Sequence, residues 1–187
     1  MRCVLAVVGR PRDAGLAAVI QDYEGRAARY WPLEVKEVRE ERATSLTPDE
    51  VRKREGVRLR EAVGSARVIA CDEGGASYTS SAFSTWLQKQ REAARDIAFV
   101  IGGAFGLDRT LRDAAAERMT LAPWTLPHEL ARLILVEQLY RAGTIGRGRV
   151  VRRGRVARVR AAASRERATF AQARHRAACD RGRRRRR

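Results

Sequence analysis

The sequence is poor in cysteine and has no long apolar run. Its three cysteines, Cys3, Cys71 and Cys179, are odd in number and far apart, so they fit neither a disulfide framework nor a zinc site. No stretch approaches the roughly 18 consecutive apolar residues that a membrane-spanning helix needs. The start lacks the layout of a signal peptide, because the apolar run 3–8 is short and Gly-Arg-Pro-Arg follows it. We therefore expect a cytoplasmic protein with no membrane span and no bound metal.

Acidic residues are almost absent from the end of the chain. The whole chain has a formal net charge of +17. Residues 1–145, however, hold 22 Lys and Arg against 20 Asp and Glu, whereas residues 146–187 hold 17 Arg against only Glu166 and Asp180. The sequence therefore predicts a nearly neutral domain over 1–145 and an Arg-rich tail over 146–187. The tail has too few large apolar residues to form a core, so we expect it to be disordered on its own.

Apolar strands alternate with amphipathic helices through the first 145 residues. Continuous apolar runs are typical of strands buried on both faces of a parallel sheet. The alternation predicts an α/β fold with a mostly parallel sheet of five or six strands and helices on both faces. Thr47 and the pair Ser80-Ser81 are the expected caps of two helices. The expected strands are 3–8, 33–38, 67–72, 96–101 and 119–121, and the expected helices are 16–30, 47–64, 80–87, 107–118 and 125–142.

Three loops follow expected strands, at 71–75, 102–106 and 121–126. In a parallel sheet, ligands bind outside the carboxyl ends of the strands. We therefore expect the three loops to converge on one crevice. The dinucleotide fingerprint Gly-x-Gly-x-x-Gly is missing after the first strand, where Gly9-Arg10-Pro11-Arg12 stands, which argues against a doubly wound nucleotide-binding enzyme.

Three separated motifs occur in order along the chain. They are Ile101-Gly102-Gly103-Ala104-Phe105-Gly106-Leu107, then Thr125-Leu126-Pro127-His128-Glu129-Leu130-Ala131-Arg132, then Glu137-Gln138-Leu139-Tyr140-Arg141-Ala142. Together they resemble the RlmH family, the ribosomal RNA large subunit methyltransferases of the SPOUT class, over about residues 1–145. The resemblance implies an α/β fold with a deep trefoil knot and a homodimer. It also implies an S-adenosylmethionine-dependent enzyme that methylates ring nitrogen 3 of a pseudouridine in the 23S rRNA of the assembled ribosome.

The resemblance also implies where the cofactor lies. S-adenosylmethionine would be held by backbone groups and an apolar slot for adenine, which suits these loops. For Cys71 an inert buried side chain is an equally good interpretation. For Trp124 the alternative is ordinary core packing. The implied cofactor-binding residues are Cys71, Gly102, Gly103, Leu121, Ala122, Pro123, Trp124, Thr125 and Leu126.

His128 and Arg132 are the candidate catalytic residues. His128 begins the last helix, where its imidazole contacts cofactor or RNA, or holds the fold together. Arg132 lies one helical turn further on, where it meets an RNA phosphate or an acid of a partner subunit. The general base is not identified by the sequence.

The chain departs from the family after the last helix. Relatives end there with a short Gly-Glu-x-Tyr-His segment at the active site, whereas this chain has no tyrosine after Tyr140. The alternative function is therefore an impaired knot protein that binds cofactor and rRNA without turnover. The tail itself is either a basic arm that binds rRNA phosphates or, as a hypothesis, a frameshifted translation of a GC-rich gene.

Overall fold

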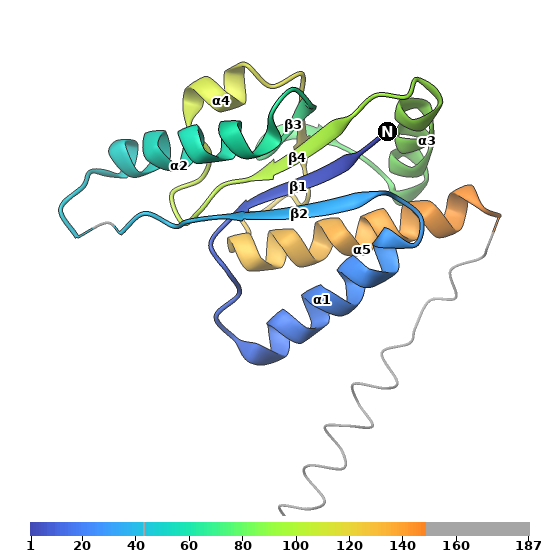
Figure 1. Ribbon diagram of the computed structural model, residues 1–187, viewed down its shortest axis with the longest axis horizontal. Coiled ribbons are helices and arrows are strands. Elements are labelled where there is room, and N and C mark those ends of the chain that lie inside the picture. The colour runs from blue at the N-terminus through green and yellow to red at the C-terminus, as the bar shows by residue number, and fades with distance from the viewer. Residues whose placement is uncertain (43, 149–187) are drawn as a thin grey trace, which may run out of the picture. The chain divides into compact units, whose positions relative to one another are not determined.

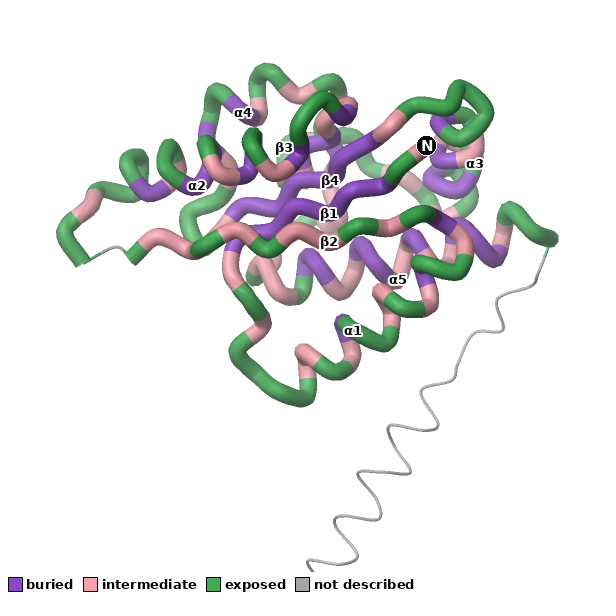
Figure 2. Tube along the Cα trace, in the orientation of Figure 1, coloured by how far each residue is buried: buried purple, intermediate pink, exposed green. Residues whose placement is uncertain are grey.

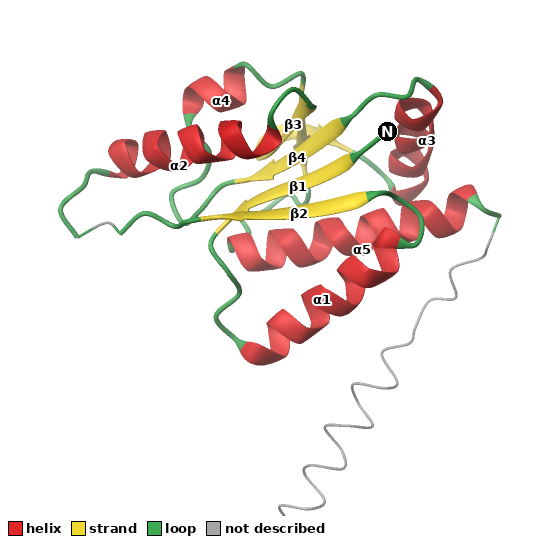
Figure 3. Ribbon diagram, in the orientation of Figure 1, coloured by secondary structure: helices red, strands yellow, loops and turns green. Residues whose placement is uncertain are grey.

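The computed structural model of this chain describes residues 1–42 and 44–148, where a parallel β-sheet lies between two layers of helices (Figure 1, Figure 3). The predicted α/β fold is confirmed, because strands and helices alternate throughout this part. The elements in chain order are β1 (Cys3–Val8), α1 (Ala14–Ala28), β2 (Leu33–Val38), α2 (Pro48–Val63), β3 (Arg67–Ser77), α3 (Ser80–Glu92), β4 (Ile97–Ile101), α4 (Arg109–Asp113), β5 (Glu117–Thr120) and α5 (His128–Gly146).

The sheet has five strands in the described part, in the order β2-β1-β4-β3-β5, and every neighbouring pair is parallel. All residues of the central strands β1 and β4 are buried (Figure 2). Leu5 of β1 lies opposite Val35 of β2 and Phe99 of β4. The continuous apolar runs therefore form the centre of the sheet, as expected for strands covered on both faces.

Side chains of the sheet enter two separate cores. On β1, Leu5 and Val7 pack against α1, α3 and α5, whereas Val4 and Ala6 pack against α2 and α4. This alternation is the period of two that a strand imposes. Helices therefore cover both faces of the sheet, as predicted (Figure 1).

Two helix starts test the expected caps. Thr47 caps α2 as predicted, and its side chain and that of Glu50 form a reciprocal capping box. The expected cap Ser80-Ser81 is wrong by one residue. Thr79 caps α3 instead, because it still has extended backbone (φ −70°, ψ 157°) and its hydroxyl accepts the Ala82 N–H.

Strand β3 continues to Ser77, five residues beyond its expected end at 72. Cys71 and Ala76 both pair with Met119 of β5, so the residues between them form a bulge at this edge of the sheet. Gly75 allows the close approach, since a Cβ there would lie 2.4 Å from the Met119 nitrogen. The expected loop after β3 is therefore a bulge within a longer strand.

The predicted tail begins at the end of α5, which runs to Gly146. The rest of the tail, from residue 149, lies outside the described residues, so its expected disorder stays a prediction.

Candidate functional site

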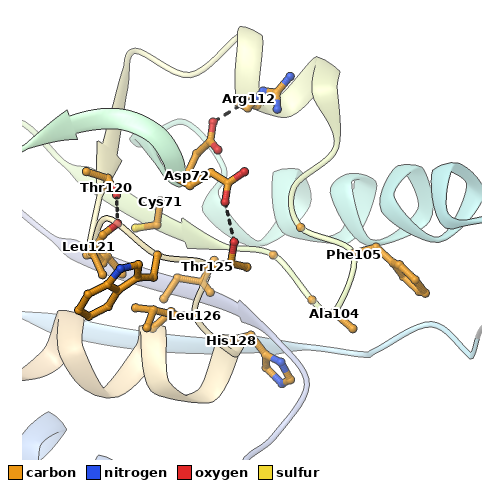
Figure 4. A pocket seen from close by; sticks show the side chains of 18 of the residues that line it. Cys71, Asp72, Ala104, Phe105, Arg112, Thr120, Leu121, Thr125, Leu126 and His128 are labelled. Carbon is orange, nitrogen blue, oxygen red and sulfur yellow. Dashed lines mark hydrogen bonds and ion pairs between the residues drawn. The ribbon is translucent and has the colours of Figure 1, made fainter.

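A cavity of about 390 Å³ opens at the carboxyl ends of β3, β4 and β5, beside the first turn of α5 (Figure 4). Its walls include residues 71–73, 101–106 and 120–122, together with 124–126. The three predicted segments thus meet at one crevice, although the segment 71–75 is a bulge within β3 rather than a loop. The cause is the parallel sheet, which places the ends of neighbouring strands at one edge.

Eight of the nine residues expected to bind the cofactor line this cavity. The exception is Pro123, which belongs to the same loop but is not part of the cavity wall. The placement brings the expected set together, while cofactor binding itself stays a prediction. The eight residues are Cys71, Gly102, Gly103, Leu121, Ala122, Trp124, Thr125 and Leu126.

The glycine turn after β4 closes tightly on itself. The Gly106 N–H donates a hydrogen bond to the Gly103 carbonyl (3.0 Å), and Gly106 has φ +82°. A Cβ on Gly102 would lie 2.4 Å from the Gly106 carbonyl carbon, closer than real Cβ contacts come. Only glycine fits at position 102, so the turn presents bare backbone to the cavity.

Polar contacts join the loops around the cavity. Asp72 forms ion pairs with Arg118 (2.7 Å) and Arg112 (3.9 Å). The Thr125 hydroxyl donates a hydrogen bond to Glu73 Oε2 (2.8 Å; Figure 4). These contacts tie the bulge of β3 to β5 and to the chain on either side of β5, and so fix the relative positions of the cavity walls.

The apolar wall combines buried and exposed side chains. Trp124 is 74% exposed, so it does not pack in the core, and the interpretation as core packing is wrong. Cys71 is half-buried, and burial raises the pKa of its thiol to about 12. The thiol is therefore neutral at physiological pH and presents an apolar surface rather than a thiolate.

The two candidate catalytic residues lie in different surroundings. His128 lines the cavity at the start of α5, with its Nε2 3.7 Å from the position that a Cβ on Gly9 would take. Arg132 is 5% exposed and is not part of the cavity wall. Its guanidinium donates hydrogen bonds to Glu24 (2.8 Å) and Glu37 (2.7 Å). Arg132 thus joins α1, β2 and α5 within one subunit.

Several residues around the cavity were missed from the sequence. Arg52 of α2 and Arg112 of α4 line it, as do Asp72 and Glu73. Asp72 is the last residue of the expected third strand and Glu73 follows it, which is a signal for a site at its carboxyl end. The two arginines carry no such signal, because only tertiary packing brings α2 and α4 to this edge.

Behind the glycine turn lies a buried carboxyl group, that of Glu55 in α2, which is 2% exposed. Its Oε1 accepts the Glu41 N–H (3.0 Å), whereas Oε2 has no hydrogen-bond partner in the described part of the chain. A Cβ on Gly103 would lie 2.7 Å from this Oε2. Burial raises the pKa of Glu55, an effect that the Glu41 N–H opposes, and the nearby Glu40 carboxylate raises it further.

We expect Glu55→Gln to stabilise the fold at neutral pH by about 1 kcal/mol, because it removes a buried charge and keeps an acceptor for the Glu41 N–H. The raised pKa means that the fold favours the protonated acid. The stability that Glu55 contributes to the wild type is complete below the ordinary pKa of 4.5 and is lost as pH rises through the raised pKa. Urea unfolding at a series of pH values should therefore show an advantage of the variant that grows with pH and then levels off.

The matched control is Glu61→Gln, on an exposed position of the same helix. This control should change the free energy of unfolding by less than about 0.5 kcal/mol at every pH. An advantage of Glu55→Gln that is equal at all pH values would show that folding does not raise the pKa of Glu55.

Residues 1–42 and 44–148 give no sign of a metal centre or a membrane span. No group of three or more His, Cys, Asp or Glu residues there is arranged to hold a metal ion. No helix within these ranges is long and apolar enough to cross a membrane.

The chain is similar to known proteins over most of its length. A family model described as predicted SPOUT methyltransferase matches residues 1–150. Relatives called ribosomal RNA large subunit methyltransferase H, from Gemmatimonas aurantiaca and Anaeromyxobacter sp. (strain Fw109-5), are 59% and 46% identical over 149 residues, which make up 79% of this chain and 97% of each relative. Among solved structures, the SpoU methyltransferase AviRb from Streptomyces viridochromogenes in complex with AdoMet is 17% identical, with a TM-score of 0.37, and the match covers 74% of this chain and 56% of that one.

Proposed function

This chain belongs to the SPOUT methyltransferases, in the RlmH family, and we propose that it transfers the methyl group of S-adenosylmethionine to ring nitrogen 3 of a pseudouridine in 23S rRNA. The name of the relatives, which this chain covers almost completely, supports large-subunit rRNA as the substrate. The proposal includes the features that the family resemblance implies: a trefoil knot, a homodimer and action in the cytoplasm on the assembled ribosome.

The cavity at the carboxyl ends of β3, β4 and β5 carries this proposal. Its volume of about 390 Å³ falls within the range of roughly 300–1,000 Å³ that small-molecule sites occupy. Ile101, Leu121 and Leu126 offer an apolar slot that suits adenine, and Gly102 brings bare backbone to the same space. The residues present therefore fit S-adenosylmethionine.

The reaction depends on the positions of the reacting atoms more than on chemical groups from the protein. S-adenosylmethionine, when bound, supplies a methyl group on a positively charged sulfur. A bond forms between the ring nitrogen and the methyl carbon, while the carbon–sulfur bond breaks and leaves its electron pair on sulfur. Holding the reacting atoms in line contributes roughly 7–11 kcal/mol towards the barrier. The ring nitrogen also gives up its proton, and His128 in the cavity wall is our candidate to accept it.

We expect the full chain to transfer labelled methyl groups from S-adenosylmethionine to ribosomes that lack the modification. The measurement compares it with a version that ends at Gly148, which keeps α5 complete. Ribosomes with uridine at the target position are the substrate control, and they should accept at least tenfold less label if the enzyme requires pseudouridine. Titration calorimetry with S-adenosylhomocysteine tests the cofactor site separately.

The outcomes separate the two functions. Transfer by the full chain but not by the shorter version would mean that residues 149–187 replace the terminal segment that this chain lacks. Binding of S-adenosylhomocysteine and ribosomes without transfer by either version would contradict the enzyme and support the impaired binding protein. No binding of S-adenosylhomocysteine would contradict both functions.

A further inference from the structure

A second hollow, which we call the α2–α4 groove, lies next to the cavity proposed for the cofactor. It has a volume of about 960 Å³ and runs between α2 and the segment 107–114, which contains α4. Arg52, Phe105 and Arg112 line both the groove and the cavity. The groove is therefore a continuation of the candidate active site along the surface, and the reaction proposed above gives it no role.

Positive side chains outnumber negative ones in this groove. Arg52 and Lys53 come from α2, and Arg109 and Arg112 come from α4. The acids of the groove are Asp49, Asp108 and Asp113.

The acids leave the positive side chains available to an incoming anion. Asp108 is 7% exposed and caps α4 by accepting the Leu111 N–H, so it forms part of the wall. Asp49 (73% exposed) pairs with Arg52, and Asp113 (53% exposed) pairs with Arg109 and Arg112. Ion pairs at exposed positions contribute only about 0–1 kcal/mol, so a phosphate can replace these carboxylates at little cost. Arg112 also pairs with the less exposed Asp72 of the cavity wall, and this pair stays in place.

Phe105 supplies an aromatic surface at the junction of the groove and the cavity. It is 40% exposed, although an apolar ring of this size is usually buried. Its ring points away from Cys71, Leu121 and Leu126 (Figure 4). An Arg52 Nη1 donates to the Phe105 backbone carbonyl (3.3 Å), which places a guanidinium next to the backbone of this residue. Exposed aromatic rings next to positive side chains are typical of sites for single-stranded nucleic acid.

We propose that the α2–α4 groove binds the RNA nucleotides next to the target base. Phe105 stacks on a base, while Arg52, Lys53, Arg109 and Arg112 contact phosphates. The proposal rests on the proposed function, because it takes rRNA as the substrate of the adjoining cavity.

The test reverses two exposed charges of the groove, Lys53→Glu with Arg109→Glu, in the full chain. The matched control, Lys89→Glu with Arg95→Glu, makes the same change in charge at exposed positions of α3 and the turn before β4. We expect the groove variant to raise the Kd for unmodified ribosomes about tenfold or more, and the control to raise it less than about threefold. The slope of log Kd against log salt should also fall by about 1.4 for two lost phosphate contacts.

Each outcome shows whether RNA contacts the groove itself or responds only to the net charge of the protein. Equal effects of the two double variants would overturn the proposal, because the groove would then add only net charge. Affinity for S-adenosylhomocysteine must stay unchanged in both variants. If the groove variant loses it, the milder pair Lys53→Gln with Arg109→Gln replaces it under the same criteria. Phe105→Leu should weaken binding of ribosomes, whereas Phe105→Trp should bind them like the wild type. Equal binding by the two variants would exclude stacking.

The binding measurement also separates this proposal from the proposed function. If the wild type binds ribosomes without methyl transfer, the enzyme is contradicted, while the ratio of Kd values still decides the role of the groove. If transfer occurs but the groove variant binds like the control, the groove faces something other than RNA and the inference is wrong.

Discussion

Replacing Gly102 by alanine should abolish cofactor binding, with a loss of affinity for S-adenosylhomocysteine of at least about 100-fold. The added Cβ would lie 2.4 Å from the Gly106 carbonyl carbon, 2.6 Å from its oxygen and 2.7 Å from the Leu107 nitrogen. All three are backbone atoms of the same turn, so no side chain can rotate to make room. The turn must open, and it forms a wall of the cavity. Such overpacking should also lower the free energy of unfolding by roughly 1–3 kcal/mol.

The matched control is Gly25→Ala in α1, where a Cβ would meet nothing within 4 Å. This change should stabilise the fold by roughly 0.5–1 kcal/mol, because alanine favours a helix more than glycine does, and it should leave cofactor affinity unchanged. Calorimetry of the folded variants gives both affinities. Binding within threefold of the wild type in Gly102→Ala would contradict the placement of the cofactor against this turn.

The centre of the fold could be predicted from the sequence because a simple pattern encodes it. Buried strands such as β1 and β4 are unbroken apolar runs, and their burial on both faces leaves few alternatives. The bulge of β3 could not be predicted in the same way. Gly74 and Gly75 normally indicate a turn, and the pairing of Ala76 with Met119 depends on β5, which lies far along the chain.

The candidate site could be predicted only in part. The rule for carboxyl ends of parallel strands predicts the loops, and the family resemblance adds the individual residues. Neither the strand rule nor the resemblance predicts Arg52 and Glu55, because on α2 they belong to a run of charged residues that looks uniformly solvated. Burial separates them, since Glu55 contacts the glycine turn from behind while Arg52 lines the cavity. Sequence periodicity cannot supply that distinction in a helix with so few apolar residues.

Arg132→Met should destabilise the fold by about 3 kcal/mol, because it leaves Glu24 without its partner and Glu37 with only the exposed Arg10. The Arg132 side chain is 6% exposed, and its guanidinium donates to Glu24 of α1 and Glu37 of β2. Methionine preserves much of the apolar stem and volume, so the loss measures the ion pairs rather than a cavity. The two carboxyl groups are 17% and 27% exposed, which keeps the penalty below that of a fully buried charge.

Removing the two acids as well decides what Arg132 does. In the triple variant Arg132→Met, Glu24→Gln, Glu37→Gln, most of the lost free energy of unfolding should return, because the only charge left without its partner is the exposed Arg10. Urea unfolding measures these free energies. The KM for ribosomes tests the competing interpretation, in which Arg132 binds an RNA phosphate. A residue that binds an RNA phosphate would raise the KM of the single and triple variants alike, without a change in stability. We expect the opposite: a large change in stability, rescue by the triple variant, and a KM that follows the fraction folded. Arg132 would then fix α5, and with it His128, beside the cavity.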